Sequence, residues 1–534
     1  MNILGIHGGT TIQQHDACAA LMIDGRLVCC VEEERLIRVK SATGILPIYS
    51  ITACLKEGGL DIRDIDLIAM PGETYEDIQE RTREWLIHHF GFAPPIETVN
   101  HQSAHLASAF YQSDYESAMC LSYDAYGDGI SGALATATMR DGIEVIETLP
   151  ATNSLGVYYA AMTSFLGFKP GEDEYKVMGL APYGEPDIDM SFFCRPSAEG
   201  YISDDMYFRD RRNATQYEPH YSQLLVDKIG APRRKGEPIT QHYKNVAAST
   251  QAALERSAVS LVEYLHRRSG QSALCLAGGV ALNCSVNRIL AKLPFIEKFF
   301  VQPAASDRGL ALGCALYATA QNGIDIAAID HVFFGPSHAE DEIEKAIELS
   351  GFKARALDDP ALEAADLVAA GKIIAWYQGR SEYGPRALGH RSILADPGLP
   401  GMKDEINKRV KFREEFRPFA PSVIEEEFKT LFDLSAPSPY MTIACDVQQG
   451  WGEKIPATTH VNNTARVQTV NKAVDPLYHA LISNLYGKTG RPAILNTSFN
   501  IRGQPIVETP LEAISTFAGN GIDALVLGPY LLEK

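Results

Sequence analysis

The sequence has 534 residues, of which 46% are hydrophobic and 22% charged, and its formal net charge is −19. One hydrophobic core usually serves ~100–250 residues, so a chain of this length predicts two or three domains. The hydrophobic fraction is that of a globular protein and argues against bulk disorder. The acidic balance argues against nucleic acid or an anionic membrane as a partner, and it makes any local basic cluster informative.

The chain opens on a strand-like run, Asn2 to Ile6, without the basic start and apolar stretch of a signal peptide. No apolar run reaches the ~18–20 residues of a membrane span. The ten cysteines form no C-x-x-C pair, which is typical of small buried side chains in a reducing compartment, although the adjacent Cys29 and Cys30 leave a redox role open. These features predict a cytoplasmic protein.

Two segments show the same order of parts. In residues 2–35 a strand ends in a polar loop, a second strand follows, and an Asp24-Gly25 turn leads into a third strand. In residues 118–149 a strand ends in the loop DAYGDG, and Asp141-Gly142 precedes the last strand. Asp-Gly is a strong hairpin signal. The repeat predicts two related subdomains with the actin-like nucleotide-binding fold, and two unrelated hairpins are the alternative.

The segment LCLAGGVALNCSVN predicts a strand that runs into Gly278 and Gly279 and then a helix. Glycines let a ligand approach the backbone closely, and a helix N-terminus favours anions. Asn283 and Asn287 are four residues apart, so they would share a helical face and could reach the hydroxyls of a nucleotide. Ordinary helix capping is the alternative for both side chains.

The alanine-rich segment HQSAHLASAFYQ predicts a helix with His101 and His105 on one face. That spacing suits two imidazoles that converge on one metal ion, although unrelated core or surface histidines give the same pattern. Asp124, at the end of a strand, and Asp307, before an apolar helix, would complete the site, with a turn residue and an N-cap as the alternatives. Such nitrogen and oxygen ligands suit Fe(II), Mn(II) or Zn(II), and the sequence does not choose among them.

A new unit begins near Gly351, and its residues 380–417 combine nine basic with six acidic side chains. The nine are Arg380, Arg386, Arg391, Lys403, Lys408, Arg409, Lys411, Arg413 and Arg417. Neighbouring acidic residues explain Lys403 to Arg409 as a solvated helix face. In the segment YGPRALGHRS the basic residues lie among Gly, Pro, Leu and Ala, so we infer that they have no acidic partner. The planar fork of arginine suits phosphate oxygens, so this part predicts phosphate binding.

The ordered set of motifs resembles the O-carbamoyltransferases of antibiotic and nodulation-factor biosynthesis, the tobramycin carbamoyltransferase type. Eleven segments carry the resemblance over nearly the whole chain: HDACAALMIDG, VEEER, HQSAHLASAF, the strand ending at Asp124, SLGVYYAAMTSFLGF, KVMGLAPYG, AGGVALNCSVN, ASDRGLALGCAL, YQGRSEYGPRALGHRSILAD, INKRVKFREEFRPFAPSV and LNTSFNIRGQPIVETP. The resemblance implies an α/β protein. An actin-like domain of the threonylcarbamoyl-transferase type (residues 1–345) would be followed by a YrdC-like α/β domain (residues 351–534).

The resemblance also assigns roles to residues. It places an iron site at His101, His105, Asp124 and Asp307. It makes His15 the catalytic base, with Asp16 beside it. It assigns the adenylate pocket to Lys176, Gly179, Gly278, Asn283 and Asn287. It assigns carbamoyl phosphate and the ATP phosphates to Arg386 and the catalytic cations Lys411 and Arg417, with further ligands in Arg466, Asn496 and Ser498.

The implied activity is ATP-dependent O-carbamoyl transfer. Carbamoyl phosphate and ATP, with Mg²⁺, would give carbamoyl adenylate in the C-terminal domain. The N-terminal domain would pass the carbamoyl group to a hydroxyl of a small natural product, with its metal acting as a Lewis acid. The acceptor stays open among aminoglycosides, nucleosides, macrolides and oligosaccharides. A homodimer is expected by resemblance alone.

One segment departs from the pattern of the family, and the role of another stays open. HGGTTIQQHD carries Gln13 and Gln14 where relatives have other residues, which leaves the shape of the loop before His15 open. Residues 184–245 are polar and weakly periodic, as expected of a lid, an acceptor-binding insertion or a plain surface loop.

Three other functions compete with this interpretation. An actin-like sugar kinase would explain the repeat but not the histidine pair or the basic C-terminal unit. A fused tRNA threonylcarbamoylation enzyme would need a tRNA partner, against which the net charge argues. A nucleotide-sensing protein without chemistry would not need the catalytic side chains.

Overall fold

The computed structural model describes residues 1–9, 14–209 and 218–534. They form two compact units. The first unit comprises Met1–Met70, Asp77–Glu97 and Gln321–Lys534, and the second comprises Pro71–Glu76 and Thr98–Ala320. The first repeat and the C-terminal region therefore share one unit. The predicted domain boundary between residues 345 and 351 stays a prediction. Gln13 and residues 210–217 of the predicted insertion lie outside the described residues.

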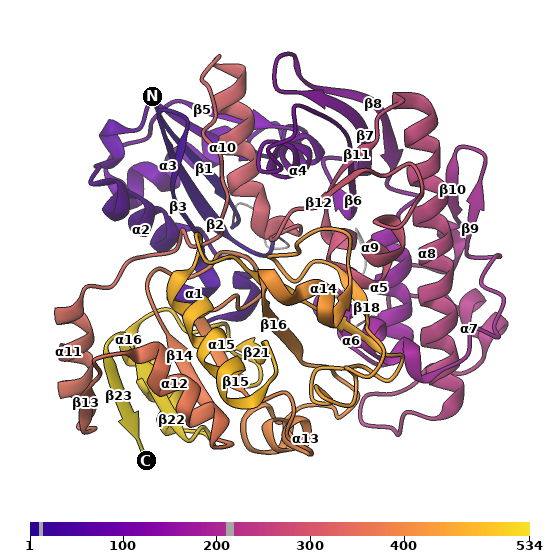
Figure 1. Ribbon diagram of the computed structural model, residues 1–534. Helices are drawn as coiled ribbons and strands as arrows, with labels where there is room; N and C mark the ends of the chain where they lie inside the picture. Colours follow the sequence, from indigo (N-terminus) through magenta and orange to yellow (C-terminus); the bar gives the residue numbers. More distant parts are fainter. Residues whose placement is uncertain (10–13, 210–217) are drawn as a thin grey trace. The chain divides into compact units, whose positions relative to one another are not determined.

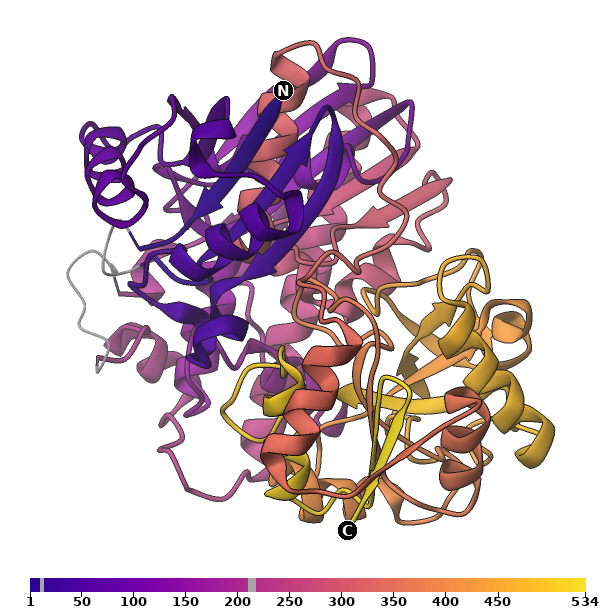
Figure 2. The ribbon, with the colours of Figure 1, turned by 90° about the vertical axis from the view of Figure 1, so that its left-hand side faces the viewer.

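The first sheet has the strand order β3-β2-β1-β4-β5. Its strands are β1 (Asn2–His7), β2 (Cys18–Ile23), β3 (Arg26–Glu32), β4 (Leu67–Pro71) and β5 (Ile96–Val99). The first three, drawn in indigo in Figures 1 and 2, form an antiparallel meander. The second and third are joined by a turn at Asp24-Gly25, and β4 is parallel to β1. Helices α2 (Ile48–Gly58) and α3 (Ile78–Phe90) contribute side chains such as Ile51 and Leu86 to the same core as Leu4.

The second sheet has the order β12-β11-β6-β7-β8. Its strands are β6 (Ser117–Gly127), β7 (Ile130–Thr138), β8 (Gly142–Pro150), β11 (Ala273–Ala277) and β12 (Lys298–Val301). Again three strands form an antiparallel meander and the fourth is parallel to the first. Both sheets therefore have the same topology, which confirms the predicted duplication and the actin-like α/β fold.

Five helices of the second unit matter for the site. They are α4 (His101–Phe110), α5 (Leu155–Phe165), α6 (Glu174–Leu180), α9 (Cys284–Leu290) and α10 (Leu310–Gln321). Helices α4 and α5 both pack against β6, whose hydrogen-bonded register with β7 becomes irregular after Tyr123. Ser122 in this strand donates a hydrogen bond to the buried Gln102 of α4 over 2.7 Å. This contact fixes the first turn of α4 against the end of the strand.

The C-terminal region is built on an eight-stranded mixed sheet in the order β13-β23-β22-β14-β15-β21-β16-β20. Its strands are β13 (Ala354–Ala356), β14 (Ile374–Tyr377), β15 (Arg391–Ala395), β16 (Ala420–Ile424), β20 (Gln468–Val470), β21 (Ala493–Ser498), β22 (Ala524–Leu527) and β23 (Tyr530–Glu533). The mixed α/β architecture agrees with the prediction, while the likeness to YrdC stays a resemblance.

Helices cover both faces of this sheet. Side chains alternate along β14, so Trp376 packs with helices α12 (Pro360–Ala369) and α15 (Pro476–Thr489). Tyr377 packs on the other face, with α11 (Glu340–Ser350) and α16 (Pro510–Ala518). Burial of both faces explains why the strand is apolar throughout instead of alternating with polar residues.

Among the described residues, no helix has the combination of length and apolarity that crossing a membrane requires. All ten cysteines lie in the described part of the chain, where they are buried and form no disulfide bond, which agrees with their predicted role as small core side chains. In the predicted insertion, strands β9 (Cys194–Ser197) and β10 (Gly200–Ser203) form a hairpin against the long helix α8 (Gln241–Ser269).

Candidate functional site

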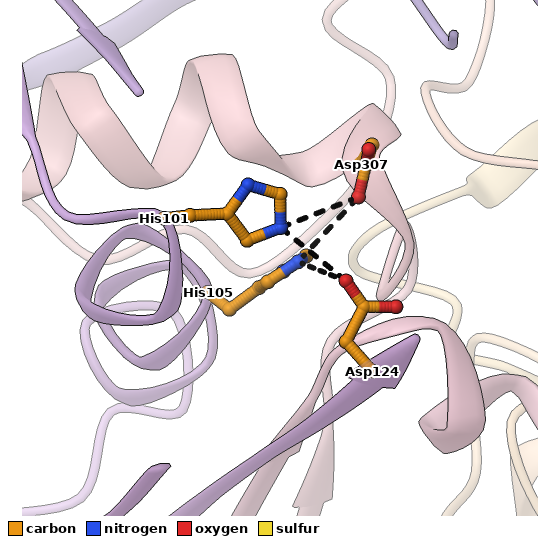
Figure 3. Close-up of side chains that lie close together, drawn as sticks. All are labelled: His101, His105, Asp124 and Asp307. Carbon is orange, nitrogen blue, oxygen red and sulfur yellow. Dashed lines mark hydrogen bonds and ion pairs between the residues drawn. The ribbon is translucent and has the colours of Figure 1, made fainter. Parts of the chain in front are cut away.

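Four predicted metal ligands converge in the second unit (Figure 3). Nε2 of His101 lies 3.3 Å from Oδ2 of Asp124 and 3.6 Å from Oδ1 of Asp307. Nε2 of His105 lies 3.5 Å and 3.7 Å from the same two oxygens. The four ligand atoms all lie within 4.8 Å of one another. Two nitrogens and two oxygens thus face one point, as expected for the ligands of a single metal ion.

Helix α4 presents the two histidines from its first two turns. Its N-cap is Asn100, whose side chain accepts hydrogen bonds from the backbone of Gln102 and Ser103, so the helix begins at His101. The backbone N–H of His101 also donates to the buried carboxylate of Asp128 over 2.8 Å. A Cβ atom on Gly127 would lie 2.2 Å from the His101 ring, so only glycine leaves room for the ring.

The carboxylate of Asp124 is oriented by the backbone. Its Oδ1 accepts a hydrogen bond from the N–H of Gly279 over 3.1 Å, which leaves Oδ2 turned toward the histidines. Gly278 precedes this donor with a φ of +88°, and a Cβ there would lie 2.4 Å from the carbonyl oxygen of Tyr123. Gly278 therefore serves a close approach to the backbone of β6 at Tyr123, and the predicted approach of a ligand to the Gly-Gly pair stays a prediction.

The fourth ligand, Asp307, comes from the turn just before α10. It opens the short 3-10 turn Asp307–Gly309, which runs directly into α10, and the N-cap of that turn is Ser306 rather than Asp307. Gly313 of α10 lies so close to α4 that a Cβ would meet the carbonyl oxygen of Ala104 at 2.0 Å. This close packing brings Asp307 to the histidine face.

The site is buried and its charges are strongly coupled. Burial alone would lower the pKa of His105, but hydrogen bonds and charge from Asp124 and Asp307 outweigh it and raise that pKa to about 9. Burial alone would raise the pKa of Asp124, but His101 and His105 outweigh it and hold that pKa well below its ordinary value. Two carboxylates around two imidazoles are suited to a divalent cation, which takes the place of the proton.

The residues predicted to line the adenylate pocket lie in the same unit. Lys176 of α6 forms an ion pair with Asp173 over 3.0 Å, and Gly179 is buried in the same helix. Asn283 is the N-cap of α9, and its amide group pairs reciprocally with that of Gln251 at 3.0 Å in both directions. Asn287 is fully buried and donates to the carbonyl of Ala281 over 2.7 Å. Asn283 makes the helix-capping contact of the alternative, since it also accepts the N–H of Val286, whereas Asn287 lies inside α9. The role of both toward a nucleotide stays a prediction.

His15 and Asp16 lie in the first unit, on the loop between β1 and β2. The side chain of His15 is about half exposed, and its Nδ1 lies 3.3 Å from Oδ2 of Asp16. Asp16 has a positive φ of 60° and donates its backbone N–H to the carbonyl of Ser41 over 2.6 Å. The carboxylate is therefore placed to orient the imidazole.

Lys411 ends the π-helical turn Asn407–Lys411 and is 5% exposed. Its ammonium group donates to the carbonyl of Ser498, and it lies 2.8 Å from Oδ1 and 3.1 Å from the carbonyl of Asn500. Burial, followed by the charges of Arg413 and Arg417, lowers the pKa of Lys411 well below its ordinary value. A bound phosphate would supply the counter-charge that this cluster needs.

The other predicted phosphate ligands surround the same sheet. Arg417 lies 3.7 Å from Glu414, and Arg386 and Arg466 are half-buried. Asn496 in β21 is buried, and its Nδ2 contacts the carbonyl of Ala387, the hydroxyl of Ser422 and the amide oxygen of Gln468 at 3.1–3.2 Å. Ser498 at the end of the strand donates to Asn500 over 2.7 Å.

Three of the nine basic residues have other partners. Arg391 is fully buried, stacks on the Tyr377 ring and lies 3.8 Å from Glu508. The segment YGPRALGHRS itself contains no acidic residue, but the inference that Arg391 has no acidic partner is wrong, because Glu508 comes from 117 residues further along the chain. Arg380 donates to backbone carbonyls, and Arg409 pairs with Glu405 and Asp523.

Sequence reasoning missed several residues that position the predicted ligands. Asp128 accepts the backbone N–H of His101, Gly127 leaves room for the ring of His101, and Asn500 contacts Lys411 and Ser498. The loop DAYGDG contains Gly127, but nothing in the sequence around His101 indicates that a glycine must lie beside its ring. Such contacts become visible only in three dimensions.

The comparisons with known proteins agree with the geometry. Residues 2–89 and 78–316 match the family described as "Carbamoyltransferase N-terminus", and residues 365–534 match "Carbamoyltransferase C-terminus". The chain is 38% identical over 554 residues to nodulation protein NolNO of Sinorhizobium fredii, covering 97% of this chain and 79% of that protein. It is 39% identical over 452 residues to nodulation protein NolO of Bradyrhizobium diazoefficiens, covering 82% and 79%.

Solved structures resemble the chain more remotely. Component A of (R)-2-hydroxyglutaryl-CoA dehydratase from Acidaminococcus fermentans matches with a TM-score of 0.34 and 15% identity, over 60% of this chain and 99% of that one. A likeness of this size adds nothing to the topology described above. The two family matches together span most of the sequence, and this chain therefore belongs to the carbamoyltransferase family of transferases.

Proposed function

We propose that this carbamoyltransferase is ATP-dependent and works in two half-reactions. The observation that carries the proposal is the division of chemistry between two clusters. One is a buried His2Asp2 set in the second unit, and the other is a set of cations around Lys411 in the first unit. The first suits a divalent metal ion, and the second suits phosphate groups.

The first half-reaction activates the carbamoyl group. Hydrolysis of carbamoyl phosphate gives carbamate and phosphate, and a carbamate oxygen attacks the α-phosphorus of ATP. The bond to pyrophosphate breaks, which leaves carbamoyl adenylate. Lys411, Arg417 and Arg386 would offset the charge that builds on the phosphate oxygens, and Mg²⁺ would accompany the ATP. Arg466, Asn496 and Ser498 would add contacts to the same substrates.

The second half-reaction transfers the carbamoyl group. An acceptor hydroxyl attacks the carbonyl carbon of carbamoyl adenylate, and the bond to AMP breaks. His15 would take the hydroxyl proton, with Asp16 stabilising the imidazolium that forms. His101, His105, Asp124 and Asp307 would hold an Fe²⁺, Mn²⁺ or Zn²⁺ ion, whose contribution when bound is Lewis acidity toward a carbonyl oxygen. Lys176 and Gly278 would contact the adenylate.

The acceptor proposed is a hydroxyl of a small natural product, as the family resemblance implies. The relatives named above are nodulation proteins, and their names do not state an acceptor. Assay of a panel of hydroxylated aminoglycosides, nucleosides, macrolides and oligosaccharides with radiolabelled carbamoyl phosphate identifies the class.

Two variants test the division of labour. Lys411→Met removes the buried ammonium, so carbamoyl-phosphate-dependent release of pyrophosphate should be lost. His101→Ala removes a metal ligand, so pyrophosphate release should persist while carbamoyl transfer is lost. Lys408→Met is the matched control for the lysine, because Lys408 lies in the same turn and is exposed. Loss of pyrophosphate release in both Lys411→Met and His101→Ala, to the same extent, would contradict two separate half-reactions.

A further inference from the structure

The motif VEEER has no role in the mechanism above, yet its charged side chains are buried. Glu32 is 2% exposed and Arg35 is 1% exposed. Nε of Arg35 lies 3.1 Å from Oε2 of Glu32, so the two form an ion pair at the end of β3. Buried charges are costly unless they are paired and hydrogen-bonded, and an apolar pair would fill the same space without that cost. The contacts that these two residues make with the C-terminal region explain why charge is kept.

Both residues hydrogen-bond to the backbone of Gly384, in the loop that carries Arg386. Oε1 of Glu32 accepts the backbone N–H of Gly384 over 2.5 Å, and Arg35 donates to the carbonyl of the same Gly384 over 2.7 Å. These partners are about 350 residues apart in sequence but belong to the same compact unit. The backbone N–H and the carbonyl of Gly384 are thus both hydrogen-bonded by the VEEER motif, two residues before Arg386.

The far end of the same loop is held by Glu382. This side chain is fully buried, and its Oε1 accepts the backbone N–H of Leu388 over 2.6 Å. Glu382 also faces Arg35. Burial alone would lower the pKa of Arg35, but the charges of Glu32 and Glu382 outweigh it and raise that pKa. Residues 385–387 therefore lie between two fixed points, Gly384 and Leu388. The carboxylates that hold these two points, Glu32 and Glu382, both interact with Arg35.

We propose that Glu32 and Arg35 are positioning residues that set the Arg386 loop for phosphate binding, so that carbamoyl activation in the C-terminal region depends on a segment of the N-terminal one. Hydrogen bonds are directional, whereas apolar packing is not, so the charged pair fixes the two peptide groups on either side of the Gly384 Cα atom and with them the start of the loop. The inference rests on the proposed function, because Arg386 is a phosphate ligand only in that proposal.

The neighbouring Glu33 supplies a matched control. It is also a fully buried carboxylate that accepts two backbone hydrogen bonds, from Tyr49 over 3.0 Å and Ser50 over 2.6 Å. Those donors belong to the start of α2 and not to the Arg386 loop. Loss of Glu33 should therefore lower stability as loss of Glu32 does, without moving the phosphate site.

The test compares Glu32→Ala, Glu32→Gln and Glu33→Ala in the full chain. Glu32→Ala should raise KM for carbamoyl phosphate about tenfold or more in the pyrophosphate-release assay, because a displaced ligand weakens binding of the substrate it holds. Glu32→Gln keeps an oxygen that can accept the Gly384 N–H, so its KM should lie between those of the wild type and Glu32→Ala. Glu33→Ala should have the wild-type KM. Equal KM values in Glu32→Ala and Glu33→Ala would overturn the inference.

Hydrogen exchange separates this outcome from a failure of the proposed function. If the wild type releases no pyrophosphate, the proposed function fails, and the positioning role is decided by exchange alone. Amides of residues 383–389 should exchange faster in Glu32→Ala than in Glu33→Ala, with Glu32→Gln between them. Unchanged exchange in that loop in Glu32→Ala overturns the positioning role, whatever the activity.

Discussion

Metal binding should displace a proton from His105 up to about pH 9. Asp124 and Asp307 raise the pKa of this imidazole from 6.5 to about 9 in metal-free protein, and only neutral imidazole binds a metal. The rise corresponds to roughly 3 kcal/mol. Between pH 6.5 and pH 9 the affinity for Mn²⁺ should therefore increase about tenfold per pH unit, or ~300-fold in all. In the metal-free protein the stabilising effect of protonated His105 is complete below pH 6.5 and is lost as the pH rises through 9.

Asp124→Asn is the perturbation that tests this coupling. Asparagine keeps the volume and the hydrogen bond from Gly279, but it removes the charge that lies 3.5 Å from Nε2 of His105. With one carboxylate left, burial has more weight and the pKa of His105 should fall toward its ordinary value. The pH dependence of Mn²⁺ binding above pH 6.5 should then shrink. Loss of a ligand should lower affinity by at least the ~10–100-fold that loss of a ligand's own hydrogen-bond partner costs.

Electron paramagnetic resonance of free Mn²⁺ measures the affinity directly at pH 6.5, 7.5 and 8.5. Asp141→Asn, a change at an exposed carboxylate of the same unit, should behave as the wild type. A wild-type affinity that does not change over this pH range, or an Asp124→Asn variant with the affinity and slope of the wild type, would refute the reasoning.

Three further changes have defined outcomes. Gly127→Ala should abolish Mn²⁺ binding, because the new Cβ would lie 2.2 Å from the His101 ring, whereas Gly487→Ala, with open space around it, should bind as the wild type does in the same titration. Arg391→Met should lower the free energy of unfolding by about 3–5 kcal/mol in urea denaturation, since it removes the cation of a buried ion pair and leaves Glu508 with only its contacts to Ser381 and His338; a loss under 1 kcal/mol would contradict this. Pyrophosphate release should decline with rising pH well below 10.5, because the lowered pKa of Lys411 removes its charge there, and Lys411→Arg should shift that decline upward.

Much of the fold followed from local sequence signals. Asp24-Gly25 and Asp141-Gly142 lie in the turns of the two meanders, and the spacing of His101 and His105 placed both on one face of a helix. These signals work because a hairpin turn and a helical period depend on residues close in sequence. The three strands of each meander also follow one another in the same order in both sheets, as the repeated order of parts in the sequence predicts.

Contacts between distant residues could not be predicted in the same way. The acidic partner of Arg391 is Glu508, and the partner of Asn283 is Gln251, and neither pairing has a local signal. Burial of Glu32 and Arg35 was equally hidden, because a run of charged residues usually indicates a solvated surface. Composition shows that a charge exists, while its partner depends on how strands from different regions meet.

The nucleotide product formed without an acceptor tests the central claim most directly. Wild-type protein is incubated with carbamoyl phosphate, ATP and Mg²⁺, and the nucleotides and phosphates are separated by ion-exchange chromatography. Attack of carbamate at the α-phosphorus predicts AMP and pyrophosphate in equal amounts, both dependent on carbamoyl phosphate, as the adenylate hydrolyses. Formation of ADP, or no nucleotide turnover at all, would contradict the account.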